Sequence, residues 1–223
     1  MKYKLAIFDL DGTILDTLQD LADATNYVLK KNGYPLRSLE EVRQFVGNGI
    51  YMLVRRAVPK ELSDQKVQDL TEQFKLYYKD HCKDKTEAYP GIISLLKKLK
   101  EKGIKTAVVS NKADYAVQIL VQDFFPDLFD KAVGEKENVR KKPCPDAVNE
   151  VLRELKVVKE EAVYIGDSEV DIQTAQNAQL NCISVCYGFR SKQFLRANKA
   201  KILVDNVNEL YKEITGEENG NMA

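Results

Sequence analysis

The chain has 223 residues, of which 44% are hydrophobic, and its 34 basic side chains balance its 34 acidic ones. These proportions are those of a folded globular protein and are too apolar for a disordered chain. The zero net charge argues against a nucleic-acid-binding surface, although a locally basic pocket is compatible with it.

The hydropathy of the chain, its cysteine spacing and its single histidine argue against several further classes of protein and site. No apolar run reaches the roughly 18 residues of a membrane span, and the N-terminal segment meets charge too early for a signal peptide. We therefore predict a cytoplasmic protein. The 4 cysteines form no CxxC pair, and the single histidine, His81, argues against a histidine-ligated metal or a Ser-His-Asp triad. Proton transfer must then fall to Asp, Glu, Lys, Tyr or Cys side chains.

The first part of the chain is predicted to be one strand followed by helices. Residues 5–10 form a short apolar run ending in acids, which indicates a buried parallel strand. Apolar spacing and capping residues then predict four helices, over 17–31, from Ser38, over 50–58, and from Ser63 to about residue 82. Residues 16–86 are therefore expected to form a helical insertion.

From residue 87 onward, strands and helices alternate. Strands are predicted at 104–109, 132–133, 162–165, 182–185 and 202–204, and helices at 92–102, 114–123, 145–155, 171–179 and 207–214. This alternation predicts a Rossmann-like α/β core with a parallel sheet, made of residues 1–15 and 87–215 and interrupted by the helical insertion at 16–86. The polar residues 216–223 are expected to be a flexible tail.

Acidic and hydroxyl side chains follow three of the predicted strands. Asp9 and Asp11 come after the first strand, Ser110 after 104–109, and Asp167 and Asp171 after 162–165. Ligands of an open parallel sheet collect at the carboxyl ends of its strands, so these side chains are expected to meet. Neighbouring carboxylates repel one another unless a cation lies between them, and an all-oxygen ligand set suits Mg²⁺.

A magnesium site beside a lysine and a hydroxyl suits a bound phosphate group. The metal and the lysine balance the phosphate charge, and the hydroxyl donates a hydrogen bond. Lys141 and Lys142 are both candidates for this role. Asp9 could then act as a nucleophile that forms an aspartyl-phosphate.

These residues resemble, in order and over essentially the whole chain, the motifs of the haloacid dehalogenase superfamily. The matching motifs are Asp9-Leu-Asp11-Gly-Thr13, Ser110, Lys142 and Gly166-Asp167-Ser-Glu-Val-Asp171. The resemblance implies that residues 16–86 are an α-helical cap domain inserted into the core. It also implies phosphate chemistry, because the dehalogenase branch of the superfamily lacks the second acid, here Asp11.

The resemblance implies a role for each acid. Asp9 would attack the phosphoryl group, and Asp11 would protonate the leaving oxygen and later activate the hydrolytic water. Mg²⁺ would be held by Asp9, the main-chain carbonyl of Asp11 and Asp167. Asp171 would lie close to the metal or its waters.

The resemblance is greatest to the phosphoglycolate phosphatases, and it extends to the residues expected to bind phosphate. It is carried by Asp16-Thr17, Val46-Gly-Asn-Gly49, Ser110-Asn-Lys112 and Lys142-Pro-Cys-Pro145. Ser110, Lys142 and the N–H of Asn111 would bind the phosphoryl oxygens. The resemblance favours Lys142 over Lys141 for this role, because Lys142 directly precedes Pro143, as in the family motif.

The expected partner is therefore a small phosphorylated metabolite, with phosphoglycolate the leading candidate, acted on by a monomer or a homodimer. An inorganic pyrophosphatase, a sugar phosphomutase and a non-catalytic regulatory relative stay open as alternatives. A substrate panel would separate them.

Residues of the predicted cap have two interpretations each. Gly47, Asn48 and Gly49 either form a flexible turn or present backbone N–H groups to the non-phosphate end of the substrate. Arg43 either recognises a substrate carboxylate, as Arg55 and Arg56 also could, or is a surface charge.

Two other side chains are also open to interpretation. Lys112 could balance the acidic cluster or pair with an exposed acid. Tyr78, at helical spacing from Phe74, is expected to be a packing residue.

Overall fold

The computed structural model describes residues 2–137 and 139–217. Most of the predicted tail, residues 218–223, lies outside this range. The first two residues of the predicted tail are described. Gly216 caps the C-terminal end of the last helix, and Glu217 forms an ion pair with Lys102, with 2.8 Å between Glu217 Oε2 and Lys102 Nζ.

A six-stranded sheet forms the centre of the core, with the strand order β5-β4-β1-β6-β7-β8. Its strands are β1 (Leu5–Phe8), β4 (Lys105–Ala113), β5 (Lys131–Glu135), β6 (Ala162–Gly166), β7 (Asn181–Val185) and β8 (Ile202–Val204). Every neighbouring pair is parallel. Numbered along the core alone, this is the 3-2-1-4-5-6 order of a doubly wound fold, which confirms the predicted fold class.

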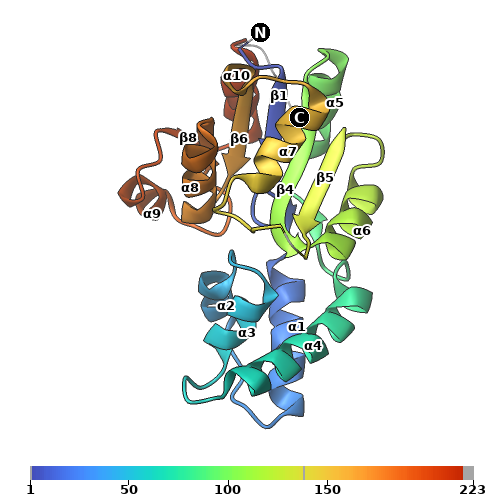
Figure 1. Cartoon of the computed structure of the whole chain (residues 1–223), viewed down its shortest axis with the longest axis vertical. Helices are drawn as coiled ribbons and strands as arrows, with labels where there is room; N and C mark the ends of the chain where they lie inside the picture. Colours follow the sequence, from blue (N-terminus) through green and yellow to red (C-terminus); the bar gives the residue numbers. More distant parts are fainter. Residues whose placement is uncertain (1, 138, 218–223) are drawn as a thin grey trace.

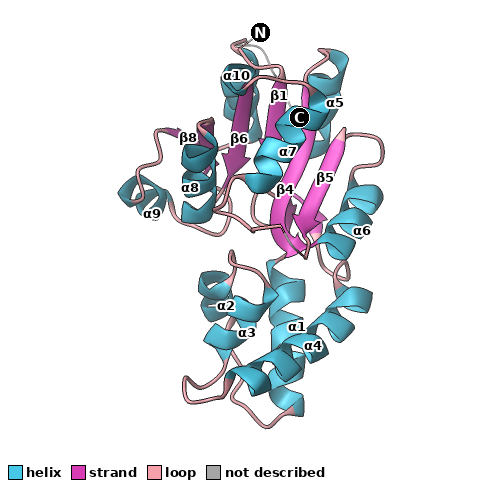
Figure 2. Ribbon diagram, viewed as in Figure 1, coloured by secondary structure: helices cyan, strands magenta, loops and turns pink. Residues whose placement is uncertain are grey.

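Helices cover both faces of the sheet, as Figures 1 and 2 show. On one face lie α5 (Ile92–Glu101), α6 (Asp114–Phe124) and α10 (Val207–Thr215). On the other lie α7 (Asp146–Leu155) and α8 (Glu169–Ala178). Because alternate side chains of β1 point to opposite faces, Phe8 packs with the first group and Ile7 with the second. Both sides of the strand are buried, which explains why its sequence is uniformly apolar.

Four helices lie together at one end of the sheet (Figure 1). They are α1 (Leu18–Lys31), α2 (Leu39–Phe45), α3 (Ile50–Ala57) and α4 (Asp64–His81), and we call them the helical unit. Their starts follow the predicted capping residues: Ser38 and Glu41 form a capping box, and the Ser63 hydroxyl accepts from the Lys66 N–H.

The chain crosses between the core and the helical unit at two short strands, β2 (Leu15–Asp16) and β3 (Glu87–Ala88), which pair antiparallel. The buried carboxylate of Asp20 reinforces this junction. It accepts hydrogen bonds from the main-chain N–H groups of Lys85 and Thr86, at 3.0 and 2.9 Å, and from the Thr86 hydroxyl at 2.8 Å. The start of α1 is thereby fastened to the segment that follows α4.

Several predicted boundaries were wrong by a few residues. Strand β4 continues to Ala113, four residues beyond the predicted end. Helix α8 begins at Glu169, because Ser168 caps it and Asp171 is the third helical residue of a capping box. Helix α7 begins at Asp146, so that Pro145 is its N-cap and not part of its first turn.

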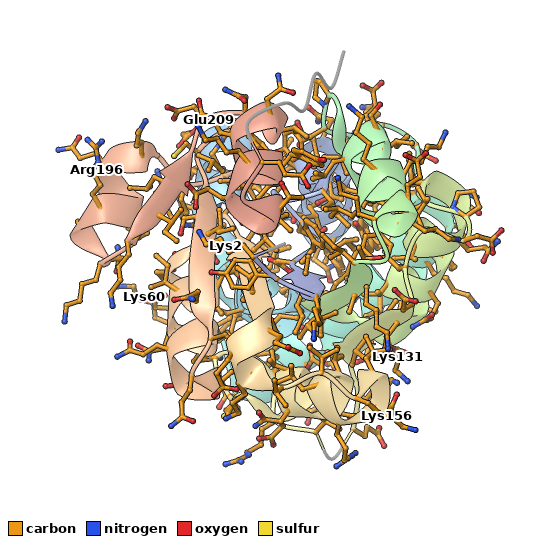
Figure 3. All side chains as sticks on the ribbon, turned by 90° about the horizontal axis from the view of Figure 1, so that it is seen from above. Lys2, Lys60, Lys131, Lys156, Arg196 and Glu209 are labelled. Carbon is orange, nitrogen blue, oxygen red and sulfur yellow. The ribbon has the colours of Figure 1, made fainter. Side chains whose placement is uncertain are left out.

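Charged side chains cover the outside of the molecule. Figure 3 shows Lys131, Lys156 and Arg196 projecting from its rim. Arg196 belongs to α9 (Lys192–Ala197), a short helix that the sequence analysis did not predict. None of the helices in the described part of the chain is long and apolar enough to cross a membrane.

Candidate active site

The candidate site lies at the carboxyl ends of β1, β4 and β6, where the direction of the strand order reverses. Ligands of doubly wound folds bind at this position. A cavity of about 50 Å³ opens between these strand ends and the helical unit. The core lines it with Asp9, Asp11, Ser110, Asn111, Lys112, Lys142, Asp167, Ser168, Phe189 and Arg190, and the helical unit with Leu21, Val46, Gly47, Gly49, Ile50, Leu53 and Tyr78.

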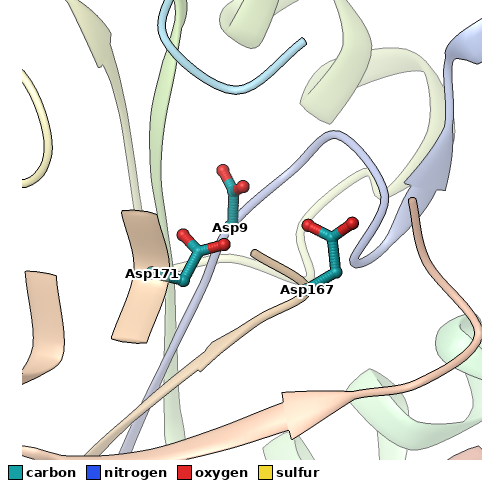
Figure 4. A group of neighbouring side chains, drawn as sticks. All are labelled: Asp9, Asp167 and Asp171. Atoms are coloured by element: carbon teal, nitrogen blue, oxygen red, sulfur yellow. The ribbon is translucent and has the colours of Figure 1, made fainter. Parts of the chain in front are cut away.

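Three buried carboxylates meet beside this cavity. Asp9, Asp167 and Asp171 each offer an oxygen within 4.8 Å of the other two, and Figure 4 shows them arriving from separate segments of the chain. Burial raises the pKa of Asp9 to about 7, and the charges of Asp171 and Asp11 add to the effect against the opposing charge of Lys142. Burial, together with the charges of Asp171 and Asp9, holds the pKa of Asp167 well above its usual range. The site therefore favours a bound cation.

The donor set fits a hard divalent metal ion. Oδ1 of Asp9 is buried and, although it lies 2.8 Å from Lys142 Nζ, it receives no hydrogen bond of good geometry. Among the described residues, Asp167 accepts one hydrogen bond, on Oδ2, from the Phe189 N–H at 2.6 Å. Both acids thus keep oxygens available for a metal, and carboxylate oxygens are ligands that Mg²⁺ accepts.

Asp171 is engaged more completely. Its Oδ2 accepts from the N–H and hydroxyl of Ser168, at 3.1 and 2.6 Å, and its Oδ1 accepts from Lys142 Nζ at 2.8 Å. It therefore contributes charge to the cluster while its own oxygens orient α8 and Lys142. Asp171 therefore both caps α8 and belongs to the acidic cluster.

The ammonium of Lys142 lies at the centre of the buried charges. It is 2.8 Å from both Asp9 Oδ1 and Asp171 Oδ1 and 3.1 Å from the Tyr164 hydroxyl. Burial alone would lower the pKa of Lys142, but the charges of Asp171 and Asp9 raise it well above the ordinary lysine value. Lys141, in contrast, is exposed and pairs with Glu135.

Asp11 lies outside the carboxylate cluster, although it lines the same cavity. Its Oδ1 accepts hydrogen bonds from the Thr17 hydroxyl at 2.6 Å and from Lys112 Nζ at 2.8 Å. Lys112 is therefore a buried partner of a site acid and does not pair with an exposed one. The carboxylate of Asp11 is separate from the candidate metal ligands.

The last residues of β4 bring polar donors to the cavity. Ser110 and Asn111 are both buried. The Asn111 amide donates to the carbonyls of Gly47 and Lys142, at 3.1 Å each. Asn111 thus connects the core to the glycine-containing loop of the helical unit.

The structure separates the predicted cap residues into two groups. Gly47 and Gly49 line the cavity, with φ angles of +119° and +83° that favour glycine. Asn48 instead accepts a hydrogen bond from Arg56 at 2.7 Å, and Arg43 lies outside the cavity, paired with Glu40 at 3.2 Å. Arg55 donates to main-chain carbonyls of the helical unit.

The sequence analysis missed Arg190, a core residue that contacts the helical unit. Its guanidinium donates to the carbonyls of Arg43 and Val46, at 2.7 and 2.9 Å, and pairs with Glu169 at 3.2 Å. It follows β7 by five residues. Its place after the carboxyl end of the predicted strand 182–185 is the signal in the sequence that marks Arg190 as a candidate site residue.

Gly188 leaves space that the acidic cluster needs. A Cβ atom at this position would lie 2.2 Å from the Gly12 carbonyl oxygen and 2.5 Å from Asp167 Cβ. We expect Gly188→Ala to displace Asp167 and to lower turnover at this site on the order of 100-fold, the effect of a misplacement of about 1 Å. The affinity for a divalent metal ion, measured by calorimetry, should fall in parallel.

Gly103→Ala is the matched control, because no atom lies within 4 Å of its added Cβ. Its positive φ of +70° predicts a small loss of stability and no loss of metal affinity. Wild-type turnover and metal binding in Gly188→Ala would contradict the packing argument.

A family model and individual known proteins point to the same family of enzymes. Residues 6–185 match the family model described as haloacid dehalogenase-like hydrolase. A phosphoglycolate phosphatase of Pseudomonas savastanoi pv. phaseolicola is 34% identical over 214 residues, which cover 93% of this chain and 78% of that one. A phosphoglycolate phosphatase of Psychrobacter arcticus is 37% identical over 204 residues, covering 88% and 89%.

A solved structure is similar over the whole length. It is a protein of Lactobacillus delbrueckii subsp. bulgaricus described provisionally as a phosphoglycolate phosphatase. The two chains are 43% identical, with a TM-score of 0.93, and the alignment covers 97% of this chain and 100% of that one.

Proposed function

The chain belongs to the haloacid dehalogenase-like hydrolase family and is a phosphoric monoester hydrolase similar to phosphoglycolate phosphatases, and we propose that phosphoglycolate is its substrate. The proposed reaction is Mg²⁺-dependent and passes through a phosphoryl group on Asp9. The observation that carries it is the meeting of Asp9 with Lys142 and two further buried acids, Asp167 and Asp171, beside one small cavity.

Asp9, Asp167 and the main-chain carbonyl of Asp11 are the proposed metal ligands, with Asp171 beside them. When bound, Mg²⁺ would offset the repulsion between the carboxylates and the phosphoryl group. The raised pKa values of Asp9 and Asp167 support this assignment, because they reflect negative charge that is buried without sufficient compensation.

The chemistry is proposed to run in two steps. A carboxylate oxygen of Asp9 forms a bond to phosphorus while the bond from phosphorus to the ester oxygen breaks, and Asp11 gives its proton to that oxygen. A water molecule then attacks phosphorus, Asp11 takes the proton of this water, and the bond to Asp9 breaks to release inorganic phosphate. Ser110, Asn111 and Lys142 are proposed to bind the phosphoryl oxygens during both steps.

The helical unit is proposed to act as a cap that closes over the substrate and excludes bulk water. In this proposal residues 16–86 are the cap, and 1–15 with 87–215 are the catalytic core. The small cavity and the apolar side chains of Leu21, Ile50 and Leu53 that line it support a small substrate. Such a metabolite phosphatase would act in the cytoplasm as a monomer or homodimer.

A substrate panel tests the proposal. We expect phosphate release from phosphoglycolate to exceed release from diphosphate and from sugar phosphates by at least about tenfold in kcat/KM, a difference of about 1.4 kcal/mol in transition-state binding. Removal of Mg²⁺ with EDTA should abolish release, and added Mg²⁺ should restore it.

Each alternative predicts a different result in the same panel. Preference for diphosphate would indicate a pyrophosphatase, and interconversion of sugar phosphates without net release would indicate a phosphomutase. Intact Mg²⁺ binding with no turnover of any substrate would indicate a regulatory relative.

A further inference from the structure

Lys112 is a buried cation with two partners. It lies on β4, and 2% of its side chain is exposed. Its Nζ lies 2.8 Å from Asp11 Oδ1 and 2.7 Å from the Tyr78 hydroxyl, and 4.7 Å from the centre of the Tyr78 ring. A buried ammonium is stable only where charges and hydrogen-bond acceptors surround it. Asp11 and Tyr78 therefore hold this ammonium at one position.

The two carboxylate oxygens of Asp11 differ in their hydrogen bonds. Oδ1 accepts from both Lys112 and the Thr17 hydroxyl. Oδ2 accepts no hydrogen bond from any residue in the described part of the chain. A carboxyl group held by two donors on one oxygen has a restricted rotation, and its other oxygen is left to carry and transfer a proton.

Tyr78 extends this chain of contacts into the helical unit. It belongs to α4, is fully buried, and packs against Phe74 with 5.3 Å between ring centres. The Tyr78 hydroxyl can accept from Lys112 only while α4 lies against β4. The position of the ammonium therefore depends on both parts of the molecule.

We infer that Lys112 is a positioning residue for proton transfer, which orients Asp11 so that Oδ2 faces the ester oxygen, and that Tyr78 in turn positions Lys112. This inference rests on the proposed function, in which Asp11 is the proton donor. It differs from two simpler roles for Lys112. A structural role would lower the turnover of all substrates together, and direct phosphate binding would raise KM.

The test compares Lys112→Met with Lys105→Met, a substitution in the same strand at an exposed lysine that donates to the Leu155 carbonyl. Steady-state kinetics with Mg²⁺ are measured on phosphoglycolate, whose alkoxide leaves poorly, and on p-nitrophenyl phosphate, whose phenolate leaves without protonation. We expect Lys112→Met to lower kcat/KM, which reports phosphoryl transfer to Asp9, on the order of 100-fold for phosphoglycolate and less than about fivefold for the aryl ester. KM should not rise by more than about threefold, and Lys105→Met should match wild type.

A second pair of variants tests the Tyr78 contact and keeps the inference testable should Lys112→Met fail to fold. Tyr78→Phe removes one hydroxyl from a buried ring, and Tyr3→Phe does the same at a tyrosine that accepts from Asn181, outside the cavity. Tyr78→Phe should lower kcat/KM for phosphoglycolate about fivefold to tenfold with little effect on kcat/KM for the aryl ester. The losses in Tyr78→Phe and Lys112→Met should combine to less than their product, because both act through Asp11.

Two outcomes would overturn the inference: an equal loss for both esters in folded Lys112→Met or Tyr78→Phe, or a raised KM with unchanged kcat. Its failure is distinguishable from failure of the proposed function. Loss of turnover in Asp9→Asn with an unchanged ester ratio in both variants rejects the positioning role alone. Normal turnover in Asp9→Asn rejects the proposed function itself.

Discussion

Asp9→Asn is expected to lower kcat on the order of 10⁵-fold or more, the scale on which loss of a nucleophile acts in other hydrolases. The amide is a poor nucleophile and also a weaker metal ligand than the carboxylate. Phosphate release from phosphoglycolate under saturating Mg²⁺ measures the effect. Mass spectrometry must exclude deamidation of the new asparagine, which would restore the aspartate.

The same variant should be more stable than wild type without metal at high pH. The pKa of Asp9 is raised to about 7 in the folded protein. Its carboxyl group therefore favours the folded state when protonated, and this contribution is lost as the pH rises from about 4 through 7. At pH 8 without metal, Asp9→Asn should raise Tm by at least about 2 °C, and the gain should shrink at pH 5.

Asp123→Asn is the control for both measurements, because Asp123 lies on α6, is exposed, and forms an ion pair with Lys83. It should leave turnover unchanged. Turnover of Asp9→Asn near the wild-type rate would reject the covalent route. A lower Tm than wild type at pH 8 would show that the carboxylate stabilises the metal-free fold.

Asp11→Asn should produce the second largest loss, on the order of 10³-fold in kcat for phosphoglycolate. Asparagine keeps an oxygen that can accept from Thr17 and Lys112, so the geometry around Oδ1 should survive. The amide cannot release a proton to the leaving alkoxide. The loss in kcat/KM for p-nitrophenyl phosphate, which reports only phosphoryl transfer to Asp9, should be much smaller, because its leaving group needs no protonation.

Burst kinetics with the aryl ester provide a further measurement. If Asp11 also activates water, phosphoryl transfer to Asp9 should outpace hydrolysis in Asp11→Asn, and one equivalent of nitrophenol should appear before the steady state. Equal losses for both esters, with no burst, would remove Asp11 from proton transfer.

The parts of the site that could be predicted from sequence are those that local chain direction determines. Asp9 and Asp167 each follow an apolar run, and parallel pairing brings the ends of such runs to the same edge of the sheet. The preference for Lys142 over Lys141 came from the motif around Pro143. The structure places Lys142 among the acids and Lys141 outside them.

Contacts between distant segments could not be predicted. Lys112 and Tyr78 are 34 positions apart, and their hydrogen bond depends on how α4 packs against β4. Helical spacing at Tyr78 correctly indicated packing, but it carries no information about what the hydroxyl contacts. The strands β2 and β3 have two residues each, too few for any periodicity to reveal them.

The fastening of α1 to the segment after α4 has a mechanical consequence. Asp20 joins the outgoing and returning chains next to the ribbon formed by β2 and β3. If the cap opens as proposed, the two connections would therefore act as one hinge, about which the four helices would rotate as a rigid body. The rate of product release would then depend on a few backbone torsions at this hinge. Substitutions there would change the turnover rate without altering any group that touches phosphate.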